Sequence, residues 1–87
     1  IVFGGGEIYM KQISLAEMKP GQSGIIASII GGQGMKAKLQ SLGLRPGKKV
    51  TKLSSIFRRG PVTVSVDNFR VALGYGKAVR VFLEVEE

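Results

Sequence analysis

The chain of 87 residues is long enough for one small domain, and its apolar content of 44% is typical of a globular protein rather than a disordered one. It contains no cysteine and no histidine, which excludes disulfides, thiolate metal sites and the commonest general base. Thirteen basic residues against six acidic ones give a net charge of +7, which favours acidic proteins, phosphates or nucleic acid as partners.

The beginning of the sequence differs in character from the rest. Three consecutive glycines, Gly4 to Gly6, supply no side chains to pack, and the first methionine is Met10. We therefore expect residues 1–9 to be a flexible tail or a cloning-derived extension, and residues 10–87 to be the folded domain. The longest apolar run, residues 24–32, is well short of the ~20 residues that a membrane helix needs, and no signal-peptide pattern is visible. These observations predict a soluble, cytoplasmic protein.

Residues 14–30 predict one helical turn followed by a strand. Ser14 and Glu17 have the spacing of a capping box, and Pro20 with Gly21 ends the turn. The isoleucine-rich residues 24–30 are expected to form a strand buried on both faces, or nearly so.

A short helix is predicted over residues 34–42. Met35, Leu39 and Leu42 recur at the spacing of one helical face, with polar residues between them. Gly43 can adopt the left-handed conformation that closes a helix, and Pro46 lies three residues further on.

The remainder of the chain alternates with a period of two residues. Residues 49–57 predict a strand whose imperfect alternation indicates a bulge, and Asp67 with Asn68 predicts a tight turn between two further strands. Gly74 and Gly76 bracket a bend before the last strand. The side chains expected to point inward are Val62, Val64, Val66, Phe69, Val71, Leu73, Val79, Val81, Leu83 and Val85. About five short strands, with one short helix inserted after the first, predict a mainly β protein: a small, closed antiparallel β-barrel.

Nucleotide binding and catalysis are both disfavoured by the sequence. Residues 32–37 match G-x-G-x-x-A, but the strands that follow read as hairpins, and no acidic residue lies between Glu17 and Asp67 to bind a ribose. The scattered carboxylates form no acid–base pair, and no serine has a histidine partner. We expect no catalytic residues, no cofactor and no metal ligands.

The basic residues are concentrated in one part of the chain. Between residues 36 and 59 there are eight cationic side chains and no acidic one. Those on the flank of the predicted helix and in the loop after it can share one face; a second group lies at the tip of a predicted hairpin, beside Phe57. The residues expected to contact a partner are Lys36, Lys38, Arg45, Lys48 and Lys49, followed by Arg58 and Arg59.

Several motifs together resemble the FeoA family, ferrous iron transport protein A. The resemblance covers residues 10–85. It rests on Leu39-x-x-Leu42-Gly43-Leu44-x-Pro46-Gly47-x-x-Val50, on Gly60-Pro61-Val62, and on Val71-Ala72-Leu73-Gly74 before the final strand. These residues are structural: they identify a fold and mark no site.

The resemblance implies an SH3-like barrel in the bacterial cytoplasm, without enzymatic activity. It also implies a partner, the cytoplasmic GTPase-containing region of the Fe(II) transporter FeoB, through which the protein would be peripheral to the membrane. Two alternatives remain open: a nucleic-acid-binding barrel, favoured by the charge although not expected, and the regulatory SH3-like domain of a metal-dependent repressor. Weak self-association through an exposed strand edge also remains open.

Overall fold

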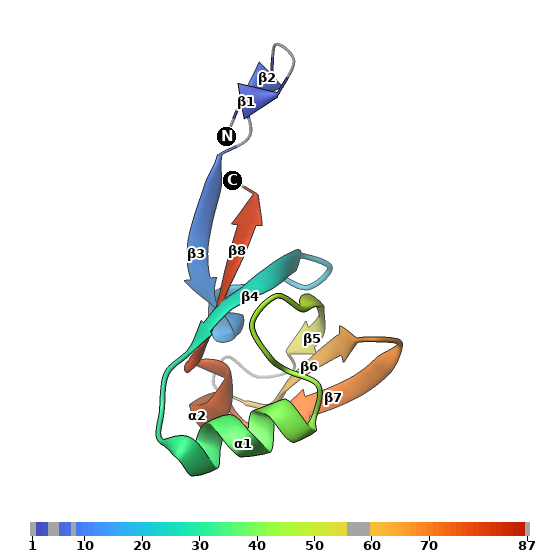
Figure 1. Cartoon of the computed structure of the whole chain (residues 1–87). Coiled ribbons are helices and arrows are strands. Elements are labelled where there is room, and N and C mark those ends of the chain that lie inside the picture. Colours follow the sequence, from blue (N-terminus) through green and yellow to red (C-terminus); the bar gives the residue numbers. More distant parts are fainter. Residues whose placement is uncertain (1, 4–5, 8, 56–59, 87) are drawn as a thin grey trace.

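The structure, a computed structural model, describes residues 2–3, 6–7, 9–55 and 60–86. A six-stranded antiparallel sheet forms its main part, in the order β3-β8-β4-β5-β6-β7, so that β3 and β7 are the two ends of the hydrogen-bonded order (Figure 1). The strands are β3 (Met10–Ser14), β4 (Ser23–Ile29), β5 (Lys49–Ser55), β6 (Val62–Val66), β7 (Phe69–Leu73) and β8 (Val81–Glu86).

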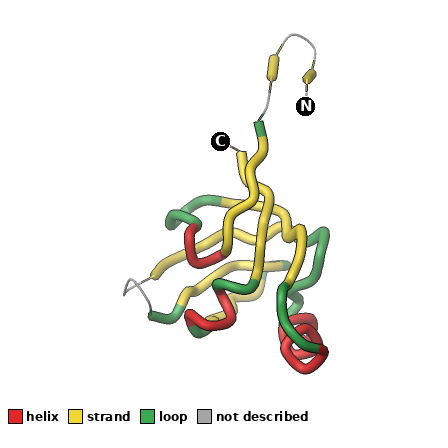
Figure 2. Tube along the Cα trace, turned by 90° about the vertical axis from the view of Figure 1, so that its left-hand side faces the viewer, coloured by secondary structure: helices red, strands yellow, loops and turns green. Residues whose placement is uncertain are grey.

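Outside this sheet, β1 (Val2–Phe3) pairs only with β2 (Gly6–Glu7) in the sheet order. The helical elements are η1 (Leu15–Glu17), α1 (Gln33–Ser41) and α2 (Tyr75–Ala78). Figures 1 and 2 place α1 at the end of the molecule opposite to the ends of the chain. Among the described residues, no helix is long and apolar enough to cross a membrane. The separation of residues 1–9 as a tail stays a prediction.

The predicted class, mainly β and antiparallel with one inserted helix, is confirmed, but the sheet has six strands rather than about five. The additional strand is β3, which pairs with β8 from Met10↔Glu86 to Ser14↔Phe82. Only one side of β3 has a neighbour in the sheet, and its residues are mostly polar and exposed, so it lacks the apolar alternation by which the other strands were recognised. The helix α1 consequently follows the second strand of the sheet.

The predicted capping box and the predicted helix in the first half of the chain are confirmed. Ser14 accepts a hydrogen bond from the backbone N–H of Glu17, whose carboxylate in turn accepts from Ser14, and this capping box begins η1. The helix α1 begins one residue earlier than expected and ends one residue earlier, and Gly43 follows it with a φ of +90°. Leu39, on its inner face, has 0% exposure.

The expectation for the isoleucine-rich strand was wrong. In β4, Ile26 and Ile29 are buried but Ile25 is 41% exposed, so the strand has one core face and one outer face. Ile30, just after the strand, is also exposed. An apolar run cannot by itself separate a strand buried on both faces from one with an apolar outer face.

The hairpin of β6 and β7 is confirmed in its turn and in most of its packing. Asp67 and Asn68 both have positive φ values, +50° and +67°, as a two-residue hairpin turn requires. The inner face of β6 is fully buried, but on β7 only Leu73 is, and the expected inward packing of Phe69 was wrong because this side chain is 70% exposed. Phe69 lies on the edge strand β7, whereas Val66, which faces it on β6, is 2% exposed, so the core covers β6 but ends before Phe69.

The core lies between the curled sheet, η1, α1 and α2. A bulge in β5, between Lys52 and Ser54, confirms the imperfect alternation of that strand. Where a bend was expected, Tyr75–Ala78 forms the short helix α2; it buries Ala78, while Val79 follows as a half-buried cap. The buried apolar residues are Leu15, Met18, Ile26, Ile29, Leu39, Leu44, Val50, Val62, Val64, Val66, Leu73, Ala78, Val81, Leu83 and Val85.

Candidate functional site

The basic stretch of the sequence divides into exposed, paired and buried side chains. Lys36 and Lys38 are exposed on α1, and Arg45 is exposed in the loop that follows it. None of these three forms a salt bridge with a described residue. The salt bridge found among the described residues belongs to Lys48. Their positive charges are therefore available to an acidic partner. We call Lys36, Lys38 and Arg45 the basic surface.

Lys48, another predicted contact residue, lies in different surroundings. The Nζ atom of Lys48 is 2.7 Å from Oδ2 of Asp67, so the turn of the β6–β7 hairpin compensates its charge. No acidic residue lies near Lys48 in the sequence, because Asp67 is 19 residues away along the chain but adjacent in space. Arg58 and Arg59 lie outside the described residues.

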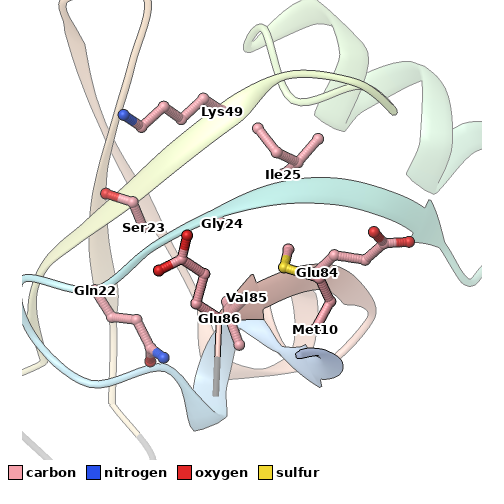
Figure 3. A pocket seen from close by; sticks show the side chains of 9 residues that line it. All are labelled: Met10, Gln22, Ser23, Gly24, Ile25, Lys49, Glu84, Val85 and Glu86. Carbon is pink, nitrogen blue, oxygen red and sulfur yellow. The ribbon is translucent and has the colours of Figure 1, made fainter. Parts of the chain in front are cut away.

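Lys49 belongs to a groove on the outer face of the sheet. It faces Ile25 across β4 and β5, and Ile25 in turn faces Glu84 of β8, so the three side chains form one row across the sheet. The groove has a volume of about 460 Å³, with Lys49 on its β5 side and Glu84 and Glu86 on its β8 side (Figure 3). Lys49 and the two glutamates therefore share a face of the sheet.

Gly24 of β4 is among the residues that line this groove. A Cβ atom at this position would lie 2.7 Å from Cγ1 of Val85 and 2.9 Å from the carbonyl oxygen of Glu84, closer than atoms can approach. Glycine thus lets β4 pack directly against β8, and any larger residue would push the two strands apart.

A buried lysine, Lys52, is a feature that the sequence analysis missed. Its exposure is 2%, and its Nζ atom donates to the carbonyl oxygens of Met18, at 2.6 Å, and Ala16, at 3.0 Å. Burial lowers the pKa of this ammonium group below its usual value. A signal was present: Lys52 is two residues from Val50 and shares its inward side of β5. Because the group is enclosed, it is a structural contact and leaves the basic surface unchanged.

The described residues offer little for catalysis or for a resident metal. They contain no group of three or more acidic, histidine or cysteine side chains arranged to hold a metal ion. Every buried polar side-chain atom among them has a hydrogen-bond partner. What the surface does offer is exposed positive charge on a small antiparallel barrel, the arrangement of a binding module.

The comparisons with known proteins identify the class and then the family. One similar solved structure is the crystal structure of an "Iron Uptake Regulatory Protein (FeoA)". It matches with a TM-score of 0.78 and 39% sequence identity, over 86% of this chain and 99% of that chain. The fold is thus the SH3-like one of small iron-uptake proteins. The FeoA domain family itself matches residues 13–85, and the chain belongs to the FeoA family, whose members are non-enzymatic accessory proteins of iron transport.

Other relatives agree with this assignment. A "Putative Fe(2+) transport protein A" of Methanocaldococcus jannaschii is 32% identical over 73 residues, which cover 84% of this chain and 87% of the relative. A manganese-dependent transcriptional repressor, in complex with manganese, has a TM-score of 0.78 but only 21% identity over 87% of this chain and 37% of the repressor. The repressor shares the fold alone.

Proposed function

We propose that the chain is a cytoplasmic accessory protein of ferrous iron uptake that binds the GTPase-containing cytoplasmic region of the Fe(II) transporter FeoB and modulates it. The observation that supports this most directly is the FeoA family membership over residues 13–85. The cations of the basic surface are exposed and form no salt bridge with a described residue. They supply a physical basis, because positive charge of this kind accelerates and orients association with an acidic partner.

The contact residues of this proposal are revised by their surroundings. Lys36, Lys38 and Arg45 remain the central set, since each is exposed on or just after α1. Lys48 contributes less, because Asp67 compensates it, and Lys49 acts next to Glu84 and Glu86 in the groove. Arg58 and Arg59 remain proposed contact residues on the evidence of sequence alone.

A binding measurement with charge-reversed variants tests the proposal. The variant Lys38→Glu with Arg45→Glu should weaken binding to the purified cytoplasmic region of FeoB about tenfold, mainly through slower, salt-sensitive association. A matched control, Lys11→Glu with Lys19→Glu, makes the same change of charge on β3 and in the turn after η1. Both variants should keep the thermal stability of the parent, since exposed substitutions usually change it by less than ~0.5 kcal/mol.

The control also decides where the contact lies. If the pair on β3 and in the turn weakens binding as much as the pair at α1, net charge and not the basic surface governs association, and the assignment of the surface is wrong. If the parent does not bind the FeoB region at any salt concentration, the proposed function itself fails.

The nucleic-acid alternative calls for its own measurement, because the net charge of +7 favours it. Binding to a random oligonucleotide should be weak, and should disappear as salt rises toward the physiological range, since phosphate contacts are lost by counterion release. Tight, sequence-dependent binding that survives this salt would favour a nucleic-acid function instead.

A further inference from the structure

An apolar notch lies where α1 ends against the β6–β7 hairpin. Its volume is about 420 Å³, and its walls include Leu42 and Gly43 from the end of α1, with Val66, Phe69 and Val71 from the hairpin. Phe69 is 70% exposed and Leu42 is 37% exposed, so two large apolar side chains stand at the notch without covering each other. A single aliphatic or aromatic side chain would fit the space and shield both from water.

The notch adjoins an open edge of the sheet. β7 is the last strand in the hydrogen-bonded order, and its five register pairs with β6 run from Val62↔Leu73 to Val66↔Phe69 without a bulge. Edge strands are usually protected by bulges, prolines or inward charges, because an open edge pairs readily with another strand. Within the described residues of β7, neither a bulge nor a proline protects this one.

The hairpin register determines which backbone groups are available. In a two-residue hairpin the residues that flank the turn, Val66 and Phe69, bond to each other, and the alternation continues along the ladder. Phe69, Val71 and Leu73 therefore direct their backbone groups to β6. Arg70 and Ala72 direct theirs outward, and no hydrogen bond to these groups is found in the part of the chain that the structure describes.

The charge at the notch indicates what would bind. Asp67, on the notch wall, is compensated by Lys48, whereas Arg70 on the same wall is exposed and forms no salt bridge with a described residue. The local charge is thus positive, as is the net charge of the chain. A second copy, also at +7, would be repelled; an acidic strand would be attracted.

We propose that the outer edge of β7 and the adjoining notch form a docking site for an extended, acidic segment of another protein. The segment adds a strand beside β7 through Arg70 and Ala72, places one apolar side chain in the notch, and sets an acidic side chain against Arg70. This site shares no residue with the basic surface, although Leu42 and Gly43 of its wall lie between Lys38 and Arg45 in the chain, and it does not depend on the identity of FeoB as a partner.

Proline at position 72 provides a selective test. The N–H of Ala72 points away from β6, so Ala72→Pro removes an outward donor without breaking the ladder, and an edge strand tolerates proline at such a position. The matched control Ala72→Ser keeps the N–H. A second variant, Phe69→Ser, removes an exposed notch side chain and leaves the buried core in place. Circular dichroism and thermal unfolding establish that each variant is folded.

The probe is a library of linear peptides of about eight residues displayed on phage, selected on the whole chain and then synthesised. We expect selected peptides to alternate apolar and acidic residues, and to bind Ala72→Pro and Phe69→Ser about tenfold more weakly than the parent and Ala72→Ser. The proposal is overturned if no peptide is enriched, or if the enriched peptides bind both variants like the parent. It is also overturned if the parent is a dimer by analytical ultracentrifugation that Ala72→Pro dissociates, since a second copy would then occupy the edge.

Discussion

The side chain of Lys52 is joined to the carbonyl oxygen of Met18 by a hydrogen bond of 2.6 Å inside the fold. A second bond from the same Nζ atom reaches Ala16, and the backbone of Lys52 adds two more: its N–H donates to Gln22, and its carbonyl accepts from Gly21. One residue of β5 thus makes four hydrogen bonds to the segment that contains η1 and the turn after it.

Replacing Lys52 should therefore destabilise the protein through the partners it leaves behind. In Lys52→Met the carbonyl oxygens of Ala16 and Met18 lose their donor, and buried acceptors without partners cost about 1–3 kcal/mol. Urea unfolding measures the change. The control Lys49→Met alters an exposed neighbour and should change the free energy of unfolding by less than ~0.5 kcal/mol. Equal stability of the two variants would contradict this role of Lys52.

The lowered pKa of Lys52 gives a pH dependence with a definite sign. Since burial lowers the pKa in the folded state, the unfolded chain binds more protons between that value and the ordinary lysine value of ~10.4. The free energy of unfolding contributed by Lys52 should therefore rise with pH across this window. The stability difference between the parent and Lys52→Met should increase from neutral pH to about pH 10, and a decrease would show the opposite shift.

Leu39 is the buried apolar side chain of α1, and Met35 packs against the core beside it. Leu39 is fully buried, so Leu39→Ala should lower the free energy of unfolding by about 2–4 kcal/mol, the usual cost of truncating a core leucine. Leu42→Ala, at the partly exposed end of the same helix, should cost clearly less. Thermal unfolding of both variants checks this, and equal losses would mean that the two leucines are equally buried.

Gly24 and Gly34 offer the same substitution in opposite environments. Gly24→Ala forces a Cβ atom against Val85 and the backbone of Glu84, and such overpacking typically costs about 1–3 kcal/mol. A Cβ atom at Gly34, in α1, meets nothing within 4 Å, so Gly34→Ala should stabilise the helix by about 0.5–1 kcal/mol. Chemical unfolding of both variants should give changes of opposite sign; a stabilising Gly24→Ala would disprove the close contact.

Much of the fold could be predicted from local signals in the sequence. The capping box at Ser14, the helix exit at Gly43 and the turn at Asp67 and Asn68 could all be predicted, because each depends on residues a few positions apart. β3 could not, since an edge strand with polar residues has no apolar period of its own to recognise.

The candidate site was less predictable than the fold, because its electrostatics depend on distant residues. Lys48, Lys49 and Lys52 look alike in sequence, yet one is paired with Asp67, one borders an acidic groove and one is buried. The exposure of Phe69 was unpredictable for a similar reason. Its alternation gives the correct side of β7, but the core covers Val66 on β6 and does not reach Phe69 on the edge strand.

The position of β8 between β3 and β4 has a consequence for biosynthesis. β8 follows every other strand of the sheet in the chain, whereas its two neighbours, β3 and β4, are the first two strands of the sheet. Until it arrives, both neighbours lack their shared partner, and pairings between strands so distant in sequence form slowly. During synthesis β3 therefore has no partner strand in the sheet until β8 is made, and a ribosome stalled before Val81 would hold a chain with this strand open to aggregation.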